Sequence, residues 1–290
     1  MGLNNTVMLY DYKDKKQIYS LDSKLDSPAT SIQWMNPSAS PLLLEGTQKG
    51  SVFIWSVPTL EKHKQPQVRS SFTAFPAFAK ALPGGGARNT TLLLDWNQDS
   101  GLLAAAGSTQ IVKVWDVETE KIRCERDTGT QCAAVAIKAV APSAYYGCLS
   151  NGTLLGVDVR VKNVTNLFSA GIGKNSRVVG MCPLGSSVVI GDFTGNMHVV
   201  DTRTFREVSC VPLVPYMSSL EAHSEMNALV ATSLKSEIVL ANREGEHIQS
   251  IRVLDGFRAL SLGKVLGSAM HPIDSAVACY NSSGIVYVYK

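Results

Sequence analysis

The fold is decided by one stretch of the chain, Ala104-Ala105-Ala106-Gly107-Ser108-Thr109-Gln110-Ile111-Val112-Lys113-Val114-Trp115-Asp116. Small apolar residues run into a polar turn, and an alternating strand follows that ends in Trp-Asp. A glycine supplies the backbone conformation that a tight turn demands, and strict alternation is typical of a half-buried strand. The stretch therefore predicts two antiparallel strands joined by a tight turn.

The same order of apolar run, turn and alternating strand recurs along the chain. It is found at 41–56, 145–158, 187–201, 228–241 and 275–289. From the third unit onward the turns are spaced close to the period of about 40–45 residues that propeller blades show. These units predict the second and third strands of WD-repeat blades.

The other two strands of a blade are visible around these units. Candidates for innermost strands lie at 31–34, 92–96, 133–137, 178–181 and 266–270. Candidates for outer strands carry charge at alternate positions, which suits an exposed blade edge, and lie at 121–125, 207–210 and 247–252. The chain is thus predicted to be an all-β, seven-bladed WD-repeat β-propeller, with six blades clear and the N-terminal blade partial.

The two ends of the chain are incomplete as blades. Residues 6–20 provide only two outer strands, and the last unit stops after its third strand at Lys290. Propellers close by removing the open edge. Either the N-terminal hairpin completes the last blade, or the closing strands lie upstream of Met1.

We expect residues 1–290 to form a single propeller domain with an insertion loop at 58–88 between two blades. The loop contains a probable strand at 67–72, an apolar piece at 75–82 and the glycines at 84–86. The apolar piece either packs on its own blade or offers a docking patch.

Composition excludes several classes of function. The net charge is only +3, without a Lys/Arg block, which argues against nucleic-acid binding. No apolar run approaches the roughly 20 residues of a membrane span, so we expect no membrane insertion. The six cysteines are scattered and favour a reducing cytosol. The opening Met1 to Thr6 fits the pattern for N-myristoylation of Gly2.

No catalytic, cofactor or metal pattern is found. The chain lacks nucleophile elbows, phosphate loops and metalloprotease motifs, and its cysteines have no histidine at ligand spacing. The histidines fall in different blades or loops, and we expect them to share no carboxylate cluster. The sequence therefore predicts a protein that is not an enzyme and has no cofactor.

The residues at the ends of the third strands are interpreted as structural. Trp55 and Trp115 are expected to pack between sheets, and Asp116, Asp158 and Asp201 to lie near the next connection. They define the blade motif, and the sequence names no partner-binding residue.

Several blade sequences are more specific than a generic repeat. They include Met35-Asn36-Pro37 with 46–55, the run from Leu94 to Gly129, and 244–257 with His271-Pro272. They resemble the C-terminal propeller of the raptor family, the scaffold subunit of TOR complex 1. The resemblance spans nearly the whole chain and is strongest at 30–130 and from 244 onward.

The resemblance implies a non-catalytic scaffold that supports TOR complex 1 assembly and TOR kinase signalling in nutrient and growth control. It implies partners among TOR complex components, and a cytoplasmic location with recruitment to lysosomal, vacuolar or other endomembranes through those partners. The caspase-like domain and helical repeats of the family have no counterpart in these 290 residues. The resemblance therefore implies either a partner-binding module or a fragment of a longer protein.

Two alternatives follow from the fold class. One is a phosphoinositide-binding propeller, whose Phe-Arg-Arg-Gly motif is approached only by Phe205-Arg206-Glu207 and Phe257-Arg258-Ala259. Neither offers paired arginines for a phosphate headgroup. The other is an adaptor such as a ubiquitin-ligase substrate receptor, and it rests on fold analogy alone.

Overall fold

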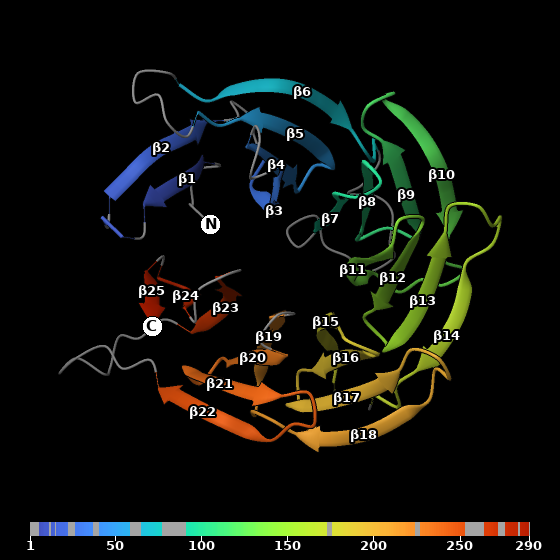
Figure 1. The fold of residues 1–290 in the computed structure, drawn as a ribbon, viewed down its shortest axis with the longest axis vertical. Coiled ribbons are helices and arrows are strands. Elements are labelled where there is room, and N and C mark those ends of the chain that lie inside the picture. Colours follow the sequence, from blue (N-terminus) through green and yellow to red (C-terminus); the bar gives the residue numbers. More distant parts are fainter. Residues whose placement is uncertain are drawn as a thin grey trace. The chain divides into compact units, whose positions relative to one another are not determined.

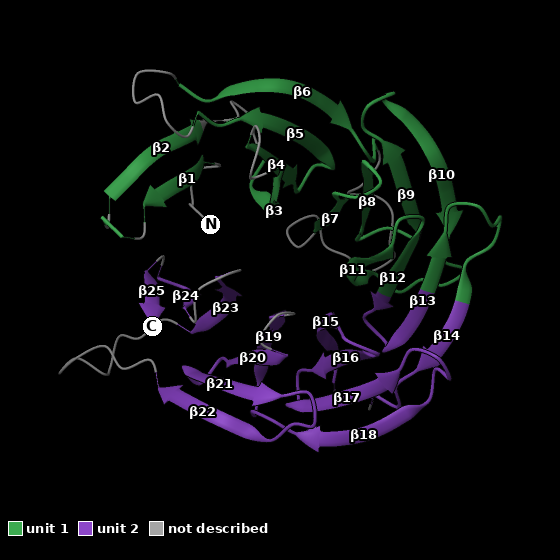
Figure 2. Ribbon diagram, in the orientation of Figure 1, with its two compact units in different colours: residues 1–147, 156–165 green, residues 148–155, 166–290 purple. Residues whose placement is uncertain are grey.

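The computed structural model describes residues 6–11, 13–14, 16–22, 27–36, 41–58, 65–76, 91–172, 176–223, 227–252, 264–271, 276–283 and 285–289. Within these ranges all regular elements are β-strands, which confirms the all-β prediction (Figure 1). No helix capable of crossing a membrane occurs in this part of the chain. The chain forms two compact units, residues 1–147 with 156–165, and residues 148–155 with 166–290 (Figure 2).

The first unit contains a two-stranded sheet and two four-stranded sheets, all antiparallel, among its described residues. The two-stranded sheet consists of β1 (Thr6–Asp11) and β2 (Lys16–Asp22). The next consists of β3 (Ala29–Met35), β4 (Leu42–Thr47), β5 (Ser51–Ser56) and β6 (Gln67–Thr73). The third consists of β7 (Leu92–Asn97), β8 (Leu102–Gly107), β9 (Ile111–Asp116) and β10 (Lys121–Asp127).

One further four-stranded sheet has strands in both units. Its strands are β11 (Ala134–Ala141), β12 (Ala144–Leu149), β13 (Thr153–Asp158) and β14 (Thr165–Ser169).

The second unit contains two four-stranded sheets and a three-stranded sheet among its described residues. The first consists of β15 (Val178–Leu184), β16 (Ser187–Asp192), β17 (Asn196–Asp201) and β18 (Glu207–Pro212). The second consists of β19 (Met217–His223), β20 (Ala228–Ser233), β21 (Glu237–Asn242) and β22 (His247–Arg252). The last consists of β23 (Val265–Met270), β24 (Val277–Asn281) and β25 (Val286–Tyr289).

The sheets agree with the predicted repeats. In each four-stranded sheet, strands that follow each other in the sequence are neighbours, as in a propeller blade. The C-terminal sheet has three strands and residues 6–22 form a hairpin, as expected for incomplete first and last units.

The second strand is the most buried strand of the β7–β10, β15–β18 and β19–β22 sheets. Every residue of β8, β16 and β20 is buried. Each of these strands has a hydrogen-bonded neighbour on both sides and apolar side chains on both faces. A continuously apolar run is what such a position requires, because neither face meets water.

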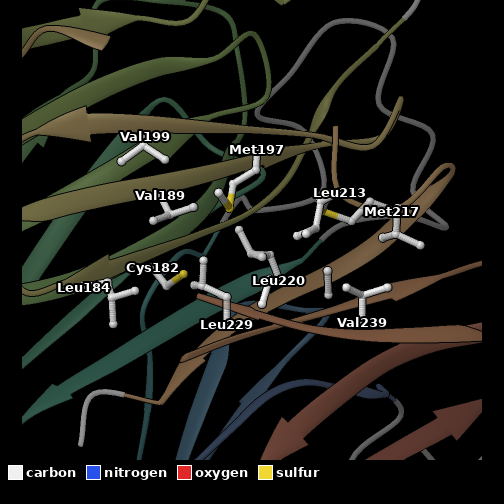
Figure 3. Packing of buried hydrophobic residues seen from close by; sticks show 13 residues of the cluster. Cys182, Leu184, Val189, Met197, Val199, Leu213, Met217, Leu220, Leu229 and Val239 are labelled. Carbon is white, nitrogen blue, oxygen red and sulfur yellow. The ribbon is translucent and has the colours of Figure 1, made fainter. Parts of the chain in front are cut away.

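The core of the second unit lies between the β15–β18 sheet and the β19–β22 sheet. Met197 and Val199 of β17 pack with Leu220 of β19 and Leu229 of β20. Figure 3 shows these side chains interleaving between the two sheets. Burial of large apolar side chains is worth about 1.5–3 kcal/mol each, so this layer contributes strongly to the stability of the unit.

The core of the first unit explains part of the predicted insertion. Residues 67–73 are the strand β6, which pairs with β5 and completes its sheet as the outer strand. Phe75 follows β6 and is buried together with Leu92 and Leu94 of β7. This end of the apolar piece at 75–82 therefore packs on its own unit, whereas residues 77–90 lie outside the described residues.

Two turn glycines are required by their backbone. Gly107 and Gly195 have φ values of +138° and +107°. A Cβ at Gly195 would overlap the carbonyl oxygen of Val214, and one at Gly107 would overlap that of Thr91. A side chain is excluded at both positions because the backbone of a connection passes directly over the glycine. At Gly107 it is the connection that enters β7, and at Gly195 it is the connection that follows β18.

Candidate interaction surface

The predicted blade residue Trp55 is a buried structural residue. Its indole Nε1 donates a hydrogen bond of 2.9 Å to Oε2 of Glu45, which lies on the neighbouring strand β4 and is fully buried. Burial raises the pKa of Glu45, while the hydrogen bond from Trp55 acts in the opposite direction. The pair holds β4 to β5 and has no access to a ligand.

Trp115 is also part of the core. Its ring centroid lies 5.4 Å from that of Phe72 on β6, and the two rings pack in the layer between the β3–β6 and β7–β10 sheets. Trp115 therefore joins two adjacent sheets of the first unit.

The aspartates that end the third strands hold the turns of their own sheets. Asp116 accepts hydrogen bonds from the backbone N–H of Thr119 and the guanidinium of Arg123, and both hold its pKa below the usual value. The guanidinium and backbone N–H of Arg160 lower the pKa of Asp158 to about 2.

Asp201 behaves in the same way. The backbone N–H groups of Thr204 and Arg203 donate to its carboxylate and lower its pKa. The aspartates stand one to a sheet, and each serves the turn between the third and fourth strands. The predicted blade residues are thus not gathered into one site.

The prediction that no histidine shares a carboxylate cluster is wrong at His198. Its Nδ1 lies 2.7 Å from Oε1 of Glu207, and its Nε2 lies 3.7 Å from Oδ2 of Asp192. The error arises because Glu207 belongs to the neighbouring strand and comes beside the histidine only through strand pairing.

A row of alternating cationic and aromatic side chains lies on the surface of the second unit. The guanidinium of Arg177 lies 5.5 Å from the ring centroid of Phe193, and the ammonium of Lys235 lies 4.7 Å from that of Tyr216. The two rings meet edge to face with their centroids 5.9 Å apart. We call these four residues the cation–aromatic strip.

The strip is assembled from connections at one end of the sheets. Phe193 lies in the turn between β16 and β17, and Lys235 in the turn between β20 and β21. Arg177 and Tyr216 precede the first strands β15 and β19. Because neighbouring strands are antiparallel, the connection that enters a first strand lies at the same end as the turn between the second and third strands.

The strip is open to water. Tyr216 is 47% exposed and has a positive φ of 57°, and Arg177 and Lys235 are exposed. Within the described part of the chain, neither cation forms a salt bridge. Cation–π contact is worth about 0.5–1 kcal/mol at exposed sites and leaves the positive charge available. The strip therefore presents two uncompensated cations beside two accessible rings.

Sequence reasoning did not identify the strip. It predicted the turns that contain Phe193 and Lys235, because Gly195 and the polar residues mark them. The four side chains come from connections of consecutive repeats, and no local spacing brings a cation over a ring. The available signal is the presence of an aromatic residue in a turn where small polar residues are usual.

Comparison with known proteins gives sequence relatives and a related structure. No family model matches the chain. It is 26% identical over 299 residues to Regulatory-associated protein of TOR 1 of Arabidopsis thaliana, covering 99% of this chain and 22% of that protein. It is 24% identical to the Protein raptor homolog of Dictyostelium discoideum, covering 100% of this chain and 19% of that protein.

The crystal structure of Chaetomium thermophilum Raptor superposes with a TM-score of 0.82 at 12% sequence identity, covering 99% of this chain and 26% of that one. This likeness shows the propeller fold. Together the matches confirm the resemblance to the raptor propeller. The chain spans about a fifth of the length of the curated relatives it matches.

Proposed function

We propose that this chain, which resembles the raptor propeller along its length, is a non-catalytic protein-interaction scaffold. It supports TOR complex 1 assembly and TOR kinase signalling in nutrient and growth control. The observation that carries the proposal is the match of 99% of the chain to Regulatory-associated protein of TOR 1. The structural burial of Trp55, Trp115 and their partners supports a non-enzymatic role, because these residues hold sheets together.

The proposal includes the setting of the protein. Its partners are other TOR complex components, and it works in the cytoplasm without inserting into a membrane or binding nucleic acid. Recruitment to lysosomal, vacuolar or other endomembranes takes place through those partners. The small net charge of +3 supports the proposal that the protein does not bind nucleic acid, because sequence-independent binding to nucleic acid requires many positive charges.

We further propose that the cation–aromatic strip is the docking surface, and that its occupant is an acidic peptide segment of a partner protein. Carboxylates of such a segment pair with Arg177 and Lys235, and the peptide lies along the rings of Phe193 and Tyr216. Aromatic and arginine side chains are the groups that anchor protein interfaces. Charge complementarity selects an acidic partner, since no carboxylate among the described residues neutralises these cations.

Affinity capture tests the function. Tagged full-length protein is recovered from its native cell under mild conditions, and TOR kinase is measured in the eluate by quantitative mass spectrometry. We expect the kinase to be enriched over an unrelated tagged propeller. Recovery of the protein without any TOR component contradicts the proposed function.

The strip is tested by charge reversal. Arg177→Glu with Lys235→Glu is compared with Lys121→Glu and Lys162→Glu, which make the same charge change at exposed positions. Lys121 is the first residue of β10 and Lys162 lies in the turn between β13 and β14, so both stand at the third-to-fourth-strand end of their own sheets. We expect the strip variant to recover at least about tenfold less of the kinase complex, with recovery that no longer depends on salt. The control variant recovers as much as the wild type.

The outcomes separate the two proposals. If both variants recover the kinase equally, the strip is not the docking surface and the scaffold function stands. If the strip variant instead loses binding to phosphoinositide vesicles while wild type binds them tightly, the surface is a lipid site and the acidic-peptide proposal fails.

A further inference from the structure

Three side chains with different metal-binding atoms lie together on the outer half of the β15–β18 sheet. They are His198 of β17 and Glu207 and Cys210 of β18, and their ligand atoms all lie within 4.8 Å of one another. His198 and Cys210 are directly paired in the strand register, so their side chains leave the same face of the sheet. A register shift at Val199 and Val200 brings Glu207 to the same place.

His198 is oriented from both sides of its ring. It is only 7% exposed, with Nδ1 2.7 Å from Glu207 and Nε2 3.7 Å from Oδ2 of Asp192. Nε2 is buried and makes no hydrogen bond. The imidazole ring thus presents Nδ1 to Glu207 and Cys210, and Nε2 to the carboxylate of Asp192.

Asp192 is itself fixed in position. Its carboxylate accepts hydrogen bonds from the hydroxyl of Thr194 and the backbone N–H groups of Gly195 and Asn196. A carboxylate that faces the second nitrogen of a histidine is the usual support of a metal-binding imidazole. When a cation takes the lone pair of Nδ1, the ring proton lies on Nε2 and faces this carboxylate.

Cys210 and Glu207 make the group accessible. Cys210 is an exposed free thiol, and the Glu207 side chain is 36% exposed. Burial and the negative charges of Glu207 and Asp192 raise the pKa of the thiol. The same two carboxylates provide negative charge that a divalent cation would neutralise. A bound cation would therefore lower the pKa of the Cys210 thiol instead of raising it.

We propose that His198, Glu207 and Cys210 form a binding site for a zinc-type divalent cation. Nδ1, a carboxylate oxygen and Sγ supply three ligands, and water takes a fourth position on the solvent side. Nitrogen, oxygen and sulfur together suit Zn²⁺, which binds them at about 2.0–2.3 Å. Asp192 is a positioning residue that touches the metal only through His198.

Binding needs little rearrangement. The distance between Nδ1 and Oε1 must open from 2.7 Å to about 3.3 Å for tetrahedral coordination. Rotation of the partly exposed Glu207 side chain supplies this movement. The thiol proton of Cys210 is released to water, and the proton shared between His198 and Glu207 moves to Nε2, so binding is favoured by rising pH.

The experiment uses the full chain with a thiol-free reductant and Co²⁺ as an optical substitute for Zn²⁺. We expect one Co²⁺ per chain and a near-ultraviolet thiolate-to-cobalt band that Zn²⁺ abolishes by displacement. Cys210→Ser removes the band, while the matched control Cys132→Ser, at a partly buried free cysteine outside the group, retains it. Asp192→Asn keeps the band but lowers cobalt affinity about 10- to 100-fold.

Folding is monitored separately, because His198→Gln also removes a buried hydrogen bond. Its circular dichroism is compared with wild type in chelator, and its cobalt band is then measured. Cys210→Ser changes an exposed residue and carries the test if His198→Gln unfolds. The proposal is overturned if wild type gives no band, or if the band survives Cys210→Ser. In either case the His198–Glu207 contact is structural only.

Discussion

The β7–β10 and β15–β18 sheets are built alike, but they differ at a polar position of the third strand. Both have a fully buried second strand and a third strand that ends in aspartate, Asp116 in one and Asp201 in the other. Three residues before this aspartate, β9 carries Lys113 and β17 carries His198. Lys113 pairs with Glu125 of the outer strand at 3.3 Å, whereas His198 meets Glu207 and Cys210.

The difference extends to the second strand. β8 ends in Gly107 where β16 ends in Asp192. His198 therefore faces a carboxylate from the second strand, whereas β8 offers none to Lys113. The apolar pattern and the turn aspartate build the sheet in both cases. Positions that neither the apolar pattern nor the turn requires differ between the two sheets. The polar side chains at these positions give each sheet binding properties that the repeat does not specify.

The largest expected effect concerns the second strands, where β16 has Ile190 at the position of Ala105 in β8. Both residues are fully buried. We expect Ile190→Ala to lower the free energy of unfolding by about 3 kcal/mol through the cavity it leaves. The reverse change, Ala105→Ile, costs about 2 kcal/mol through overpacking.

Denaturant titration measures both changes, and Val208→Ala at a 68% exposed position is the control, expected within about 0.5 kcal/mol of wild type. If Ile190→Ala left the free energy of unfolding unchanged, the larger side chain of β16 would not be needed for packing, and the expected difference between the two sheets would be contradicted.

The next effect concerns Asp192. Its burial alone would raise its pKa, but hydrogen bonds from Thr194, Asn196 and Gly195 outweigh burial and hold the pKa below the usual value. We expect Asp192→Ala to cost about 2 kcal/mol at neutral pH, because these donors lose their acceptor.

The sign of the pH dependence follows from linkage. A carboxyl group with a lowered pKa in the folded state stabilises the protein above its unfolded pKa, and this contribution is lost as the pH falls through the folded pKa. The stability difference between wild type and Asp192→Ala should therefore shrink in acid. Denaturation curves across the acidic range test this, and a difference that grows toward low pH contradicts it.

A smaller effect is expected at Lys113. Its partner Glu125 is half exposed, so water replaces the lost contact. We expect Lys113→Ala to change the free energy of unfolding by less than about 1 kcal/mol, and by less still in high salt. A cost above about 2 kcal/mol would show that the ion pair holds its sheet as firmly as the buried groups hold theirs.

The smallest expected effect is none at all. Lys113→His copies the histidine of β17 into β9, yet we expect no cobalt band to arise from this sheet. Cys124 pairs with Val114 and Glu125 pairs with Lys113, so the thiol leaves the opposite face of β10 from the carboxylate. A new thiolate band, measured in the Cys210→Ser background, would contradict the importance of register.

The strands that local pattern predicts well are those with clean alternation or continuous apolar runs. β14 and β19 were not predicted from the sequence, and the strand predicted at 67–72 was placed in an insertion loop, although β6 completes its sheet. β19 escaped notice because Ser218 and Ser219 interrupt its apolar pattern. Both hydroxyls lie within 3 Å of Oγ1 of Thr232 on β20, so these polar groups are satisfied inside the sheet.

The candidate sites were beyond local pattern for a different reason. Arg177, Phe193, Tyr216 and Lys235 come from four connections, and only the packing of neighbouring sheets brings them together. Glu207 reaches His198 through an irregular register that no residue spacing indicates. Tertiary packing and register therefore limit what the sequence reveals about both sites.

The central proposal, a raptor-like scaffold, is tested most directly by reciprocal purification. TOR kinase is isolated from native cells, and this protein is quantified in the purified complex by mass spectrometry, with wild type and the Arg177→Glu/Lys235→Glu variant expressed at equal levels. The account predicts near-stoichiometric wild-type protein and a strongly reduced amount of the variant. Absence of the wild-type protein from the purified kinase complex would contradict it.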